Sequence, residues 1–272
     1  MVEGFDWLGL TGRVCVVTGA ASGIGRASAA SLAQVGAAVA LLDRDKAGID
    51  AAAAELRGAG AKVLAVACDT ADPANVTAAA DAVRKELGPC AVLVNNAGML
   101  RAGPLDSLSL ADWNAVLAVN LTGYLLCAQA FGRDMRQAGR GSMVHVASVA
   151  ASHPQNNSGA YSASKAGVVI LARQIAAEWG PAGVRSNAVS PGLIRTPLSE
   201  AFYQAPGIVE KRAAMTASRR VGGPQDIADV VVFLASDRAG YVNGAELLVD
   251  GGFDCMLLGL VPRPGFEAKQ AR

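Results

Sequence analysis

Three residues in the second half of the chain carry side chains that together could move a proton. Tyr161 and Lys165 are four residues apart, so on a helix they would lie one turn apart on the same face. A free tyrosine has a pKa near 10, and an ammonium one turn away favours the phenolate and lowers that pKa. Ser148, thirteen residues before Tyr161, could hold a substrate oxygen while the phenol exchanges its proton. The pattern indicates chemistry at an alcohol or carbonyl oxygen, although a surface tyrosine and lysine at this spacing are common by chance.

A glycine-rich turn near the amino terminus has the form of a phosphate-binding loop. It follows an apolar segment and immediately precedes a segment expected to be helical. Glycines allow a tight turn close to a phosphate, while the N–H groups and dipole of the helix favour an anion. The spacing is G-x-x-x-G-x-G and not the G-x-G-x-x-G of the commoner nucleotide fingerprint. We therefore expect a pyrophosphate to bind at Gly19, Ser22, Gly23, Ile24 and Gly25.

An aspartate ends the second apolar segment. Asp43 stands eighteen residues after Gly25, and a carboxylate there can bond both ribose hydroxyls of adenosine. It would repel a 2′-phosphate and so select NAD over NADP. Arg44 complicates this selection, because a guanidinium next to the carboxylate could bind that phosphate. The sequence favours NAD and leaves NADP open; the alternative is a solvated acid that closes a strand.

Short apolar segments alternate with alanine-rich helical stretches along most of the chain. Segments such as Val14–Val17 and Ala91–Val94 are apolar throughout, which is typical of strands covered on both faces of a parallel sheet. The expected fold class is α/β: a single-domain, doubly wound, Rossmann-like parallel sheet of about seven strands with helices on both faces. The expected strands are Val14–Thr18, Ala38–Asp43, Lys62–Cys68, Ala91–Asn95, Ser142–Ser148, Arg185–Ser190 and Glu246–Val249. The expected helices lie near 24–35, 46–58, 74–87, 111–138, 160–179 and 225–235.

The chain shows no internal boundary until its last residues. No linker, repeat or low-complexity segment divides it, so one domain is expected over residues 1–253. Residues 254–272 are expected to form a C-terminal tail, in which Met256–Val261 is apolar and Pro262 and Pro264 forbid a helix.

The bulk composition narrows the class of protein. Of 272 residues, 52% are hydrophobic and 17% are charged, which favours a packed core over disorder. A net charge of +1 without a basic block gives no electrostatic case for nucleic acid or an anionic membrane surface. No stretch is expected to span a bilayer, and the start at Met1–Trp7 lacks the pattern of a secretory signal. The five cysteines form no C-x-x-C pair, so we expect a soluble protein of a reducing compartment, the cytoplasm.

Further motifs occur in a fixed order along the chain. After the T-G-x-x-x-G-I-G turn at 18–25 come Asn95–Gly98, Asn120, Ser148, Tyr161 with Lys165, Pro191-Gly192 and the closing Val249–Gly252. In this order and at these spacings they resemble the short-chain dehydrogenase/reductase family over about residues 10–253. Each motif alone is weak, and together they are highly specific. The resemblance implies an NAD(P)-binding domain that interconverts alcohols and carbonyl compounds by hydride transfer.

The resemblance also assigns positions around the dinucleotide. It implies that Asp69 meets the adenine ring and that Asn96 packs near the adenosine ribose. Without the family, Asp69 would be interpreted as a helix cap and Asn95–Gly98 as a polar turn. A later segment resembles the nicotinamide clamp of the family, with Pro191, Gly192, Ile194 and Thr196 as its cofactor-binding residues. In it the Ile194 backbone and the Thr196 hydroxyl would hold the carboxamide.

The same resemblance implies a mechanism centred on Tyr161. The phenol would give a proton to the carbonyl oxygen in reduction and take it back in alcohol oxidation, while Ser148 would bond the oxygen on which charge develops. Lys165 would lower the pKa of Tyr161 and bind the nicotinamide ribose. Asn120 matches the helix asparagine that holds a water and passes protons to Lys165. A kink or cap within a long helix is an alternative interpretation of Asn120.

Two regions, 149–158 and 198–218, are expected to set the choice of substrate. Their amides and apolar side chains suit a medium-sized secondary alcohol or ketone, such as a polyol, a cyclic alcohol or an aryl ketone. His153 could bond a substrate hydroxyl or be solvated, and Asn156 and Leu198 are the other candidate substrate residues. His145 lies on an apolar segment and is expected to pack in the core. No metal site is expected, because no ligand set surrounds either histidine.

Two other functions stay open at this point. A 3-oxoacyl thioester reductase acting on carrier-protein or CoA esters would use NADPH, against which Asp43 argues. A non-catalytic dinucleotide-binding protein would keep the fold without the chemistry, against which the retained Ser148, Tyr161 and Lys165 argue. Members of the family are usually tetramers or dimers, so a homotetramer is expected. The tail from residue 254 could reach a subunit interface or be loosely held.

Overall fold

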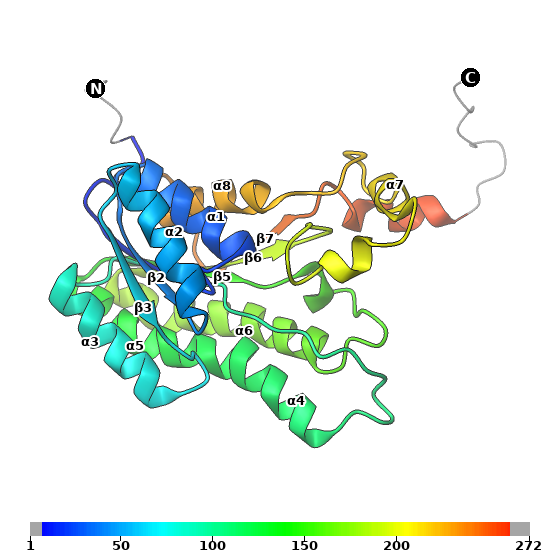
Figure 1. Ribbon diagram of the computed structural model, residues 1–272, viewed down its shortest axis with the longest axis horizontal. Helices are drawn as coiled ribbons and strands as arrows, with labels where there is room; N and C mark the ends of the chain where they lie inside the picture. The colour runs from blue at the N-terminus through cyan, green and yellow to red at the C-terminus, as the bar shows by residue number, and fades with distance from the viewer. Residues whose placement is uncertain (1–6, 262–272) are drawn as a thin grey trace.

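Seven parallel strands form one sheet in the computed structural model, which describes residues 7–261 (Figure 1). The strand order is β3-β2-β1-β4-β5-β6-β7, so the direction in which the chain adds strands reverses between β1 and β4. The registers run from Val14 opposite Ala38 to Pro191 opposite Val249. The strands are β1 (Val14–Thr18), β2 (Ala38–Asp43), β3 (Val63–Ala67), β4 (Val92–Asn95), β5 (Gly141–Val146), β6 (Val184–Pro191) and β7 (Glu246–Val249).

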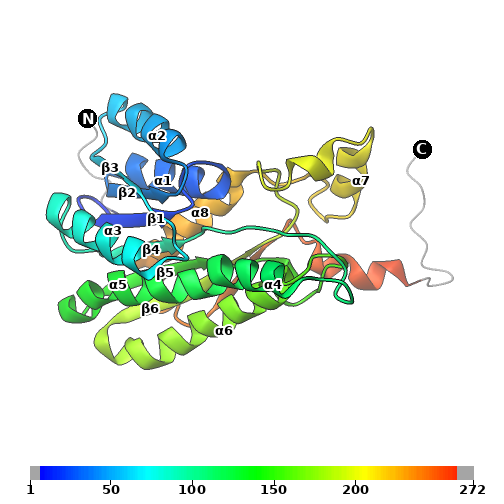
Figure 2. The same ribbon diagram turned by 60° about the horizontal axis from the view of Figure 1, so that its bottom comes forward.

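Helices cover both faces of this sheet (Figure 2). α1, α2 and α8 lie on one face, and α3, α4, α5 and α6 lie on the other. The helices are α1 (Gly23–Gln34), α2 (Lys46–Gly58), α3 (Pro73–Glu86), α4 (Leu110–Leu117), α5 (Gly123–Ala138), α6 (Tyr161–Trp179), α7 (Ile208–Ala214) and α8 (Pro224–Ala235). The doubly wound α/β fold expected from the sequence is therefore confirmed.

The apolar runs in the strands follow from this two-sided cover. In β2, Leu41 packs in the core cluster shared with α1 and α8, while its neighbour Leu42 packs in the cluster shared with α3 and α5. In β4, Val94 and Leu93 divide between the same two clusters. Because successive side chains of a strand point to opposite faces, a strand covered on both faces has no position that faces solvent, and apolar residues predominate in it.

The helix expected over 111–138 is interrupted at Asn120. α4 ends at Leu117, Ala118–Thr122 forms a π-helical turn, and α5 begins at Gly123. The Gly123 N–H bonds the Ala118 carbonyl, five residues earlier in the chain. Such π turns inside α-helices occur frequently at functional sites. Asn120 therefore lies at an interruption of the regular α-helical hydrogen bonding, and its interpretation as a kink residue stays a prediction.

The stretch Leu110–Ala138 is long and apolar enough to cross a bilayer, with a mean hydropathy of 1.5 in its best window. This differs from the expectation that no such stretch exists. In the structure 44% of that window is buried inside the protein, and Phe131 and Met135 pack against the sheet in a core cluster with Leu93. The stretch is the central helical element of one layer.

An α-helix lies in a region where the sequence predicted a loop, and a 3₁₀ helix lies where it predicted a tail. α7 lies inside the region 198–218 and starts after Gly207, whose φ is +71°. It was not predicted because a helix this short shows no clear apolar periodicity in the sequence. A 3₁₀ helix spans Asp254–Leu260, where prolines were expected to forbid a helix. That expectation is wrong because a proline disrupts the turn before it and not the turns further upstream. Pro262, Pro264 and the rest of the tail, like Met1–Asp6, lie outside the described residues.

Candidate functional site

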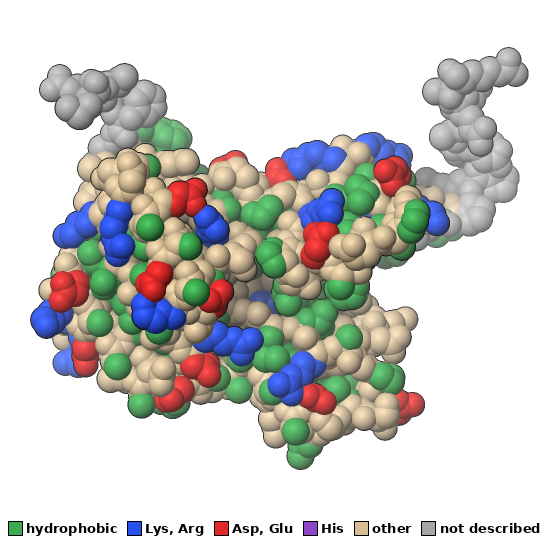
Figure 3. Space-filling view, in the orientation of Figure 1, with side chains coloured by type: hydrophobic (Ala, Val, Ile, Leu, Met, Phe, Trp, Pro, Cys, Tyr) green, Lys and Arg blue, Asp and Glu red, His purple; other side chains and the backbone are tan. Residues whose placement is uncertain are grey.

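The carboxyl ends of β1 and β4 meet where the strand order reverses. In doubly wound sheets such a switch point opens a crevice that binds ligands. The segments singled out in the sequence gather along this edge: the glycine-rich turn follows β1, Asn95–Gly98 ends β4, Ser148 follows β5, and Pro191-Gly192 ends β6. The surface is hollowed here, between the side that carries α1 and α2 and the side that carries α7 (Figure 3).

The glycine-rich turn depends on close backbone contacts. A Cβ on Gly25 would lie 2.1 Å from the carbonyl oxygen of Gly19, and Gly19 itself has a φ of +65°, in the left-handed region that favours glycine. Ser22 is the N-cap residue of α1, yet its hydroxyl makes no capping bond to the helix. Gly23 and Ile24 open α1, so the first N–H groups of the helix face the turn. The turn therefore fits the pyrophosphate of a dinucleotide.

Asn96 holds this turn from the neighbouring strand. Its side-chain amide donates to the carbonyls of Thr18 and Gly19, at 3.0 and 3.2 Å. The Thr18 hydroxyl accepts the N–H groups of Asn96 and Ala97, at 2.9 and 3.0 Å. The loops after β1 and β4 are thereby tied together. Thr18 belongs to the T-G-x-x-x-G-I-G motif but was not among the predicted site residues.

The Asp43 carboxylate lies beside the glycine-rich turn. One oxygen accepts the N–H of Ala21 at 3.1 Å, and the other accepts the N–H of Asp45 at 3.0 Å. These bonds fix the carboxylate at the end of β2 and leave further lone pairs for hydroxyl groups of a ligand. Arg44 is exposed next to it.

Asp69 follows β3 at the same edge of the sheet and is exposed. Its carboxylate accepts the N–H of Ala71 at 2.9 Å. The cap of α3 is Asp72, whose side chain accepts the N–H groups of Ala74 and Asn75. The alternative interpretation of Asp69 as a helix cap is therefore wrong, and its contact with adenine stays a prediction.

The segment after β6 forms a compact turn opposite the glycine-rich turn. The Ser199 hydroxyl donates to the Ile194 carbonyl at 2.8 Å and accepts the Thr196 N–H at 3.0 Å. A Cβ on Gly23 would lie 3.5 Å from the Thr196 Cβ, so this segment and the start of α1 stand close together across the cleft. The structure thus adds Ser199 as the residue that shapes the predicted carboxamide clamp.

Ser148, Tyr161 and Lys165 come together between the end of β5 and the start of α6. Tyr161 is the first residue of α6, and Lys165, one turn later, is 3% exposed. Ser148 and Tyr161 share a side-chain hydrogen bond. The Lys165 ammonium lies 5.8 Å from the centre of the Tyr161 ring. The spacing in the sequence therefore corresponds to a real cluster.

Burial dominates the pKa of both ionisable groups in this cluster. It lowers the pKa of Lys165 from 10.5 to about 7, because the ammonium loses its hydration. Burial also raises the pKa of Tyr161, and the hydrogen bond with Ser148 lowers it by less. The net shift of the Tyr161 pKa in this structure is therefore upward, because burial outweighs the lowering expected from Lys165.

Asn120 joins the loop after β4 to α6. Its Oδ1 accepts the Met99 N–H at 2.8 Å, and its Nδ2 donates to the Met99 carbonyl at 3.0 Å and to the Ser164 hydroxyl at 3.1 Å. A Cβ on Gly98 would lie 3.6 Å from Asn120 Oδ1 and 3.7 Å from Lys165 Nζ. The π turn therefore places the Asn120 amide on the same side of the fold as the Lys165 ammonium.

The candidate substrate residues lie on the loop after β5 and on the segment after β6. The His153 imidazole contacts the Asp254 carboxylate, which joins the loop after β5 to the C-terminal 3₁₀ helix. Asp254 is itself held by its N–H, which donates to the Asp250 carboxylate at 2.8 Å. Asn156 is exposed in the same loop as His153, and Leu198 is 51% exposed in the segment after β6. The pairing of His153 with Asp254 was missed because the two residues are distant in the sequence.

His145 is a core residue, as expected. It is fully buried, with Nδ1 3.2 Å from Asn95 Nδ2 and Nε2 3.1 Å from the Ser186 hydroxyl. Burial lowers the pKa of its imidazole to about 4, so the ring is neutral at pH 7. Within residues 7–261 no group of three or more His, Cys, Asp or Glu side chains could hold a metal ion.

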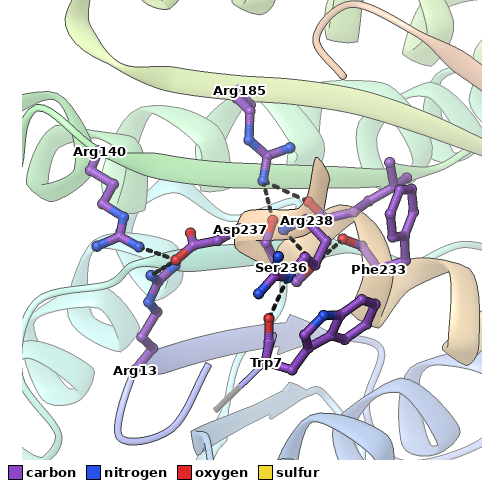
Figure 4. A network of polar contacts seen from close by, with 9 residues as sticks. Trp7, Arg13, Arg140, Arg185, Phe233, Ser236, Asp237 and Arg238 are labelled. Carbon is purple, nitrogen blue, oxygen red and sulfur yellow. Dashed lines mark hydrogen bonds and ion pairs between the residues drawn. The ribbon is translucent and has the colours of Figure 1, made fainter. Parts of the chain in front are cut away.

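A second polar cluster lies at the opposite, amino-terminal edge of the sheet. Arg13 and Arg140 both bind the Asp237 carboxylate, at 2.8 and 2.5 Å, beside a cavity of about 670 Å³ (Figure 4). Arg185 donates to two carbonyl groups at the end of α8. Cations stabilise the carboxyl ends of helices, which carry partial negative charge. This cluster therefore stabilises the fold, and it is remote from the residues predicted to do chemistry.

Comparison with known proteins identifies the family. Residues 19–254 match a family model described as Enoyl-(Acyl carrier protein) reductase. The chain is 46% identical over 245 residues to D-threitol dehydrogenase of Mycolicibacterium smegmatis, with 90% of this chain and 94% of the relative covered. This chain belongs to the short-chain dehydrogenase/reductase family.

Two further dehydrogenases are similar over nearly the whole chain. The cis-4-hydroxycyclohexanecarboxylate dehydrogenase of Sinomonas cyclohexanicum is 44% identical over 245 residues, covering 89% of this chain and 96% of the relative. A gluconate 5-dehydrogenase from Burkholderia cenocepacia, solved with NADP and tartrate, has a TM-score of 0.86 at 33% identity, covering 90% and 96% of the two chains. The chain is accordingly an oxidoreductase with a dinucleotide-binding fold that interconverts alcohols and ketones.

Proposed function

We propose that this chain is an NAD-dependent dehydrogenase of a polyol, cyclic or aryl secondary alcohol. The observation that carries the proposal is the cluster formed by half-buried Ser148 and Tyr161 with buried Lys165, between the end of β5 and the start of α6. D-Threitol is a polyol, and the named substrate of the Sinomonas relative carries a hydroxyl on a ring. Both relatives support the alcohol class, and neither name is transferred as the substrate of this chain.

The chemistry follows from the properties of the clustered side chains. A nicotinamide bound in the cleft accepts or supplies hydride. Tyr161 takes the proton of the alcohol hydroxyl in oxidation and returns it in reduction, and Ser148 donates a hydrogen bond to the substrate oxygen as charge develops on it. Lys165 changes its charge near neutral pH, so its ammonium form stabilises the Tyr161 phenolate when the proton leaves. Asn120 positions the segment that precedes Lys165 through its bond to Ser164.

The dinucleotide is proposed to lie along the carboxyl ends of β1, β2 and β4. The first N–H groups of α1 bind its pyrophosphate, and Ile194 and Thr196 hold the carboxamide. The Asp43 carboxylate, held by the N–H groups of Ala21 and Asp45, accepts the adenosine ribose hydroxyls. A 2′-phosphate would bring negative charge against that carboxylate, which supports NAD over NADP.

The substrate is proposed to extend from Ser148 toward the outer end of the cleft. There His153, oriented by the Asp254 carboxylate, can bond a second hydroxyl of a polyol. Asn156 offers an amide to the same end, and Leu198 offers an apolar surface on the opposite side. A site with both kinds of surface suits an alcohol with several carbon atoms and more than one polar group.

Oxidation of D-threitol and of cis-4-hydroxycyclohexanecarboxylate with NAD and with NADP tests the proposal, by the absorbance of reduced nicotinamide. Turnover with NAD is expected, with kcat/KM at least about tenfold above that with NADP, as the loss of hydrogen bonds to a charged group implies. Tyr161→Phe is expected to lower kcat by ~10²–10⁴ while NAD affinity survives, because it removes only the acid/base. Near-normal turnover in that variant would remove Tyr161 from the mechanism. Turnover of acetoacetyl thioesters with NADPH, and of no alcohol, would replace the proposal by 3-oxoacyl reduction.

We further propose a cytoplasmic homotetramer whose C-terminal segment borders a subunit interface. Exposed apolar side chains on the 3₁₀ helix, Leu257 and Leu258, support this placement of residues 254–261. The exposed Leu125 and Ile170 on α5 and α6, and Phe233 and Leu248 on α8 and β7, support two further contact faces. Sedimentation of the full chain measures the oligomeric state directly.

A further inference from the structure

The Lys165 ammonium has a second phenol beside it. Lys165 Nζ donates to the Val146 carbonyl at 2.8 Å and to the Tyr124 hydroxyl at 3.3 Å. The Tyr124 hydroxyl donates in turn to the same Val146 carbonyl, at 3.0 Å. The three polar groups form a closed triangle, in which the phenol oxygen accepts from the ammonium and its proton goes to the carbonyl. Neither member of the Ser148–Tyr161 pair takes part in this triangle.

The Tyr124 hydroxyl is sealed from solvent on α5. Tyr124 is 1% exposed, and burial raises the pKa of its phenol well above the usual value, so the group stays neutral. A phenol with no access to water cannot pass protons to solvent. Its hydroxyl oxygen can hold the Lys165 side chain in place and favour the ammonium form of Lys165, which donates a hydrogen bond to it.

The packing role of the ring is separate from the role of the hydroxyl. The Tyr124 ring stacks on His145, with centroids 6.1 Å apart, and the Lys165 ammonium lies 5.2 Å from the Tyr124 ring centre. The backbone carbonyl of Tyr124 accepts from Asn95 Nδ2 at 3.0 Å. A phenylalanine would keep all of these contacts. Only the bonds to Lys165 and Val146 need the oxygen.

We propose that Tyr124 is a positioning residue for the catalytic lysine: its hydroxyl oxygen accepts a hydrogen bond from Lys165, holds Nζ on the Val146 side of α6, and keeps the ammonium form available to Tyr161. The titratable groups near the pair are Tyr161 on α6, His145 on β5, whose ring is neutral, and Cys127 on α5. Burial accounts for the lowered pKa of Lys165, and no carboxylate among residues 7–261 offsets it. Tyr124 and the Val146 carbonyl therefore supply the acceptors that an acidic partner would otherwise supply.

Tyr124→Phe tests the proposal through the pH dependence of kcat for alcohol oxidation. This test rests on the proposed function, because it requires that the chain oxidises an alcohol. Without the phenol oxygen, Lys165 loses its proton more readily, the Tyr161 phenolate is less stabilised, and the acid limb of kcat moves to higher pH. The expected shift is about one pH unit, equivalent to a tenfold change in protonation, as for one hydrogen bond to a charged group. The KM for D-threitol is expected to change less than twofold. Tyr241→Phe, which alters an exposed phenol on the loop before β7, is the matched control and is expected to leave the profile unchanged.

A second measurement needs no turnover and separates this proposal from the proposed function. Between pH 6 and 9 the urea midpoint of Tyr124→Phe is expected to rise more than that of the wild type, because its Lys165 is neutral over a wider range. The role of Tyr124 would be overturned if Tyr124→Phe had the same acid limb of kcat as the wild type and its urea midpoint changed with pH in parallel with that of the wild type. This holds even if the protein oxidises alcohols. Absence of alcohol turnover in the wild type, together with the steeper stability curve in the variant, would instead refute only the proposed substrates.

Discussion

Replacing the buried lysine by an apolar side chain of similar length should make stability less dependent on pH. The pKa of Lys165 falls from 10.5 to about 7 on folding, so the unfolded chain binds more protons than the folded chain between these values. Stability of the wild type therefore rises with pH over this window. The whole shift corresponds to about 5 kcal/mol, and the part that develops between pH 6 and pH 9 is ~2–3 kcal/mol. Lys165→Met removes this contribution.

Urea unfolding of wild type and Lys165→Met at pH 6 and pH 9, at one protein concentration, measures the effect. The quantity to compare is the free energy of unfolding of the variant minus that of the wild type. This difference is expected to be ~2–3 kcal/mol larger at pH 6 than at pH 9. Losses of packing and of the bond to the Val146 carbonyl are the same at both pH values, so the difference isolates the charge. Lys85→Met, which replaces a side chain that is 82% exposed, is the control. Its free energy of unfolding should differ from that of the wild type by the same amount at pH 6 and at pH 9. If the Lys165→Met and wild-type curves are parallel, the ammonium is not desolvated as described.

Three further results are expected. Asp43→Asn should raise the KM for NAD by at least about tenfold and reduce the difference in kcat/KM between NAD and NADP, because an amide does not repel a phosphate and accepts hydrogen bonds less strongly than a carboxylate. An unchanged preference for NAD would indicate that Arg44, and not Asp43, selects the cofactor. Gly25→Ala should abolish NAD binding in a fluorescence titration, since its Cβ would meet the Gly19 carbonyl at 2.1 Å, whereas Gly58→Ala, with nothing within 4 Å, should bind normally. Truncation after Phe253 removes the partner of His153 and should raise the KM for D-threitol while lowering the mass of the assembly; a full-sized assembly with unchanged KM would dismiss the C-terminal segment from both roles.

The sequence predicted most elements because their signals are local. The strand Val14–Thr18 and the strand Glu246–Val249 have the expected bounds, since apolar runs end where turns begin. The helix over 111–138 was predicted as continuous because its composition is apolar and helical throughout. The π turn at Ala118–Thr122 depends on packing of Asn120 against Met99 and Ser164, contacts that no helical periodicity encodes.

The sequence by itself determined the chemistry that this chain could perform, because the helical spacing of Tyr161 and Lys165 and the backbone freedom of the glycine-rich turn are properties of residue type and order. Only the tertiary structure decided the electrostatics of that chemistry. The pKa of Lys165 and the bonds of its ammonium arise from burial against β5 and α5, which come from distant parts of the chain. The contact of His153 with Asp254 has the same origin. Spacing sets which groups can meet, whereas desolvation and distant partners set the charge that they carry when they do.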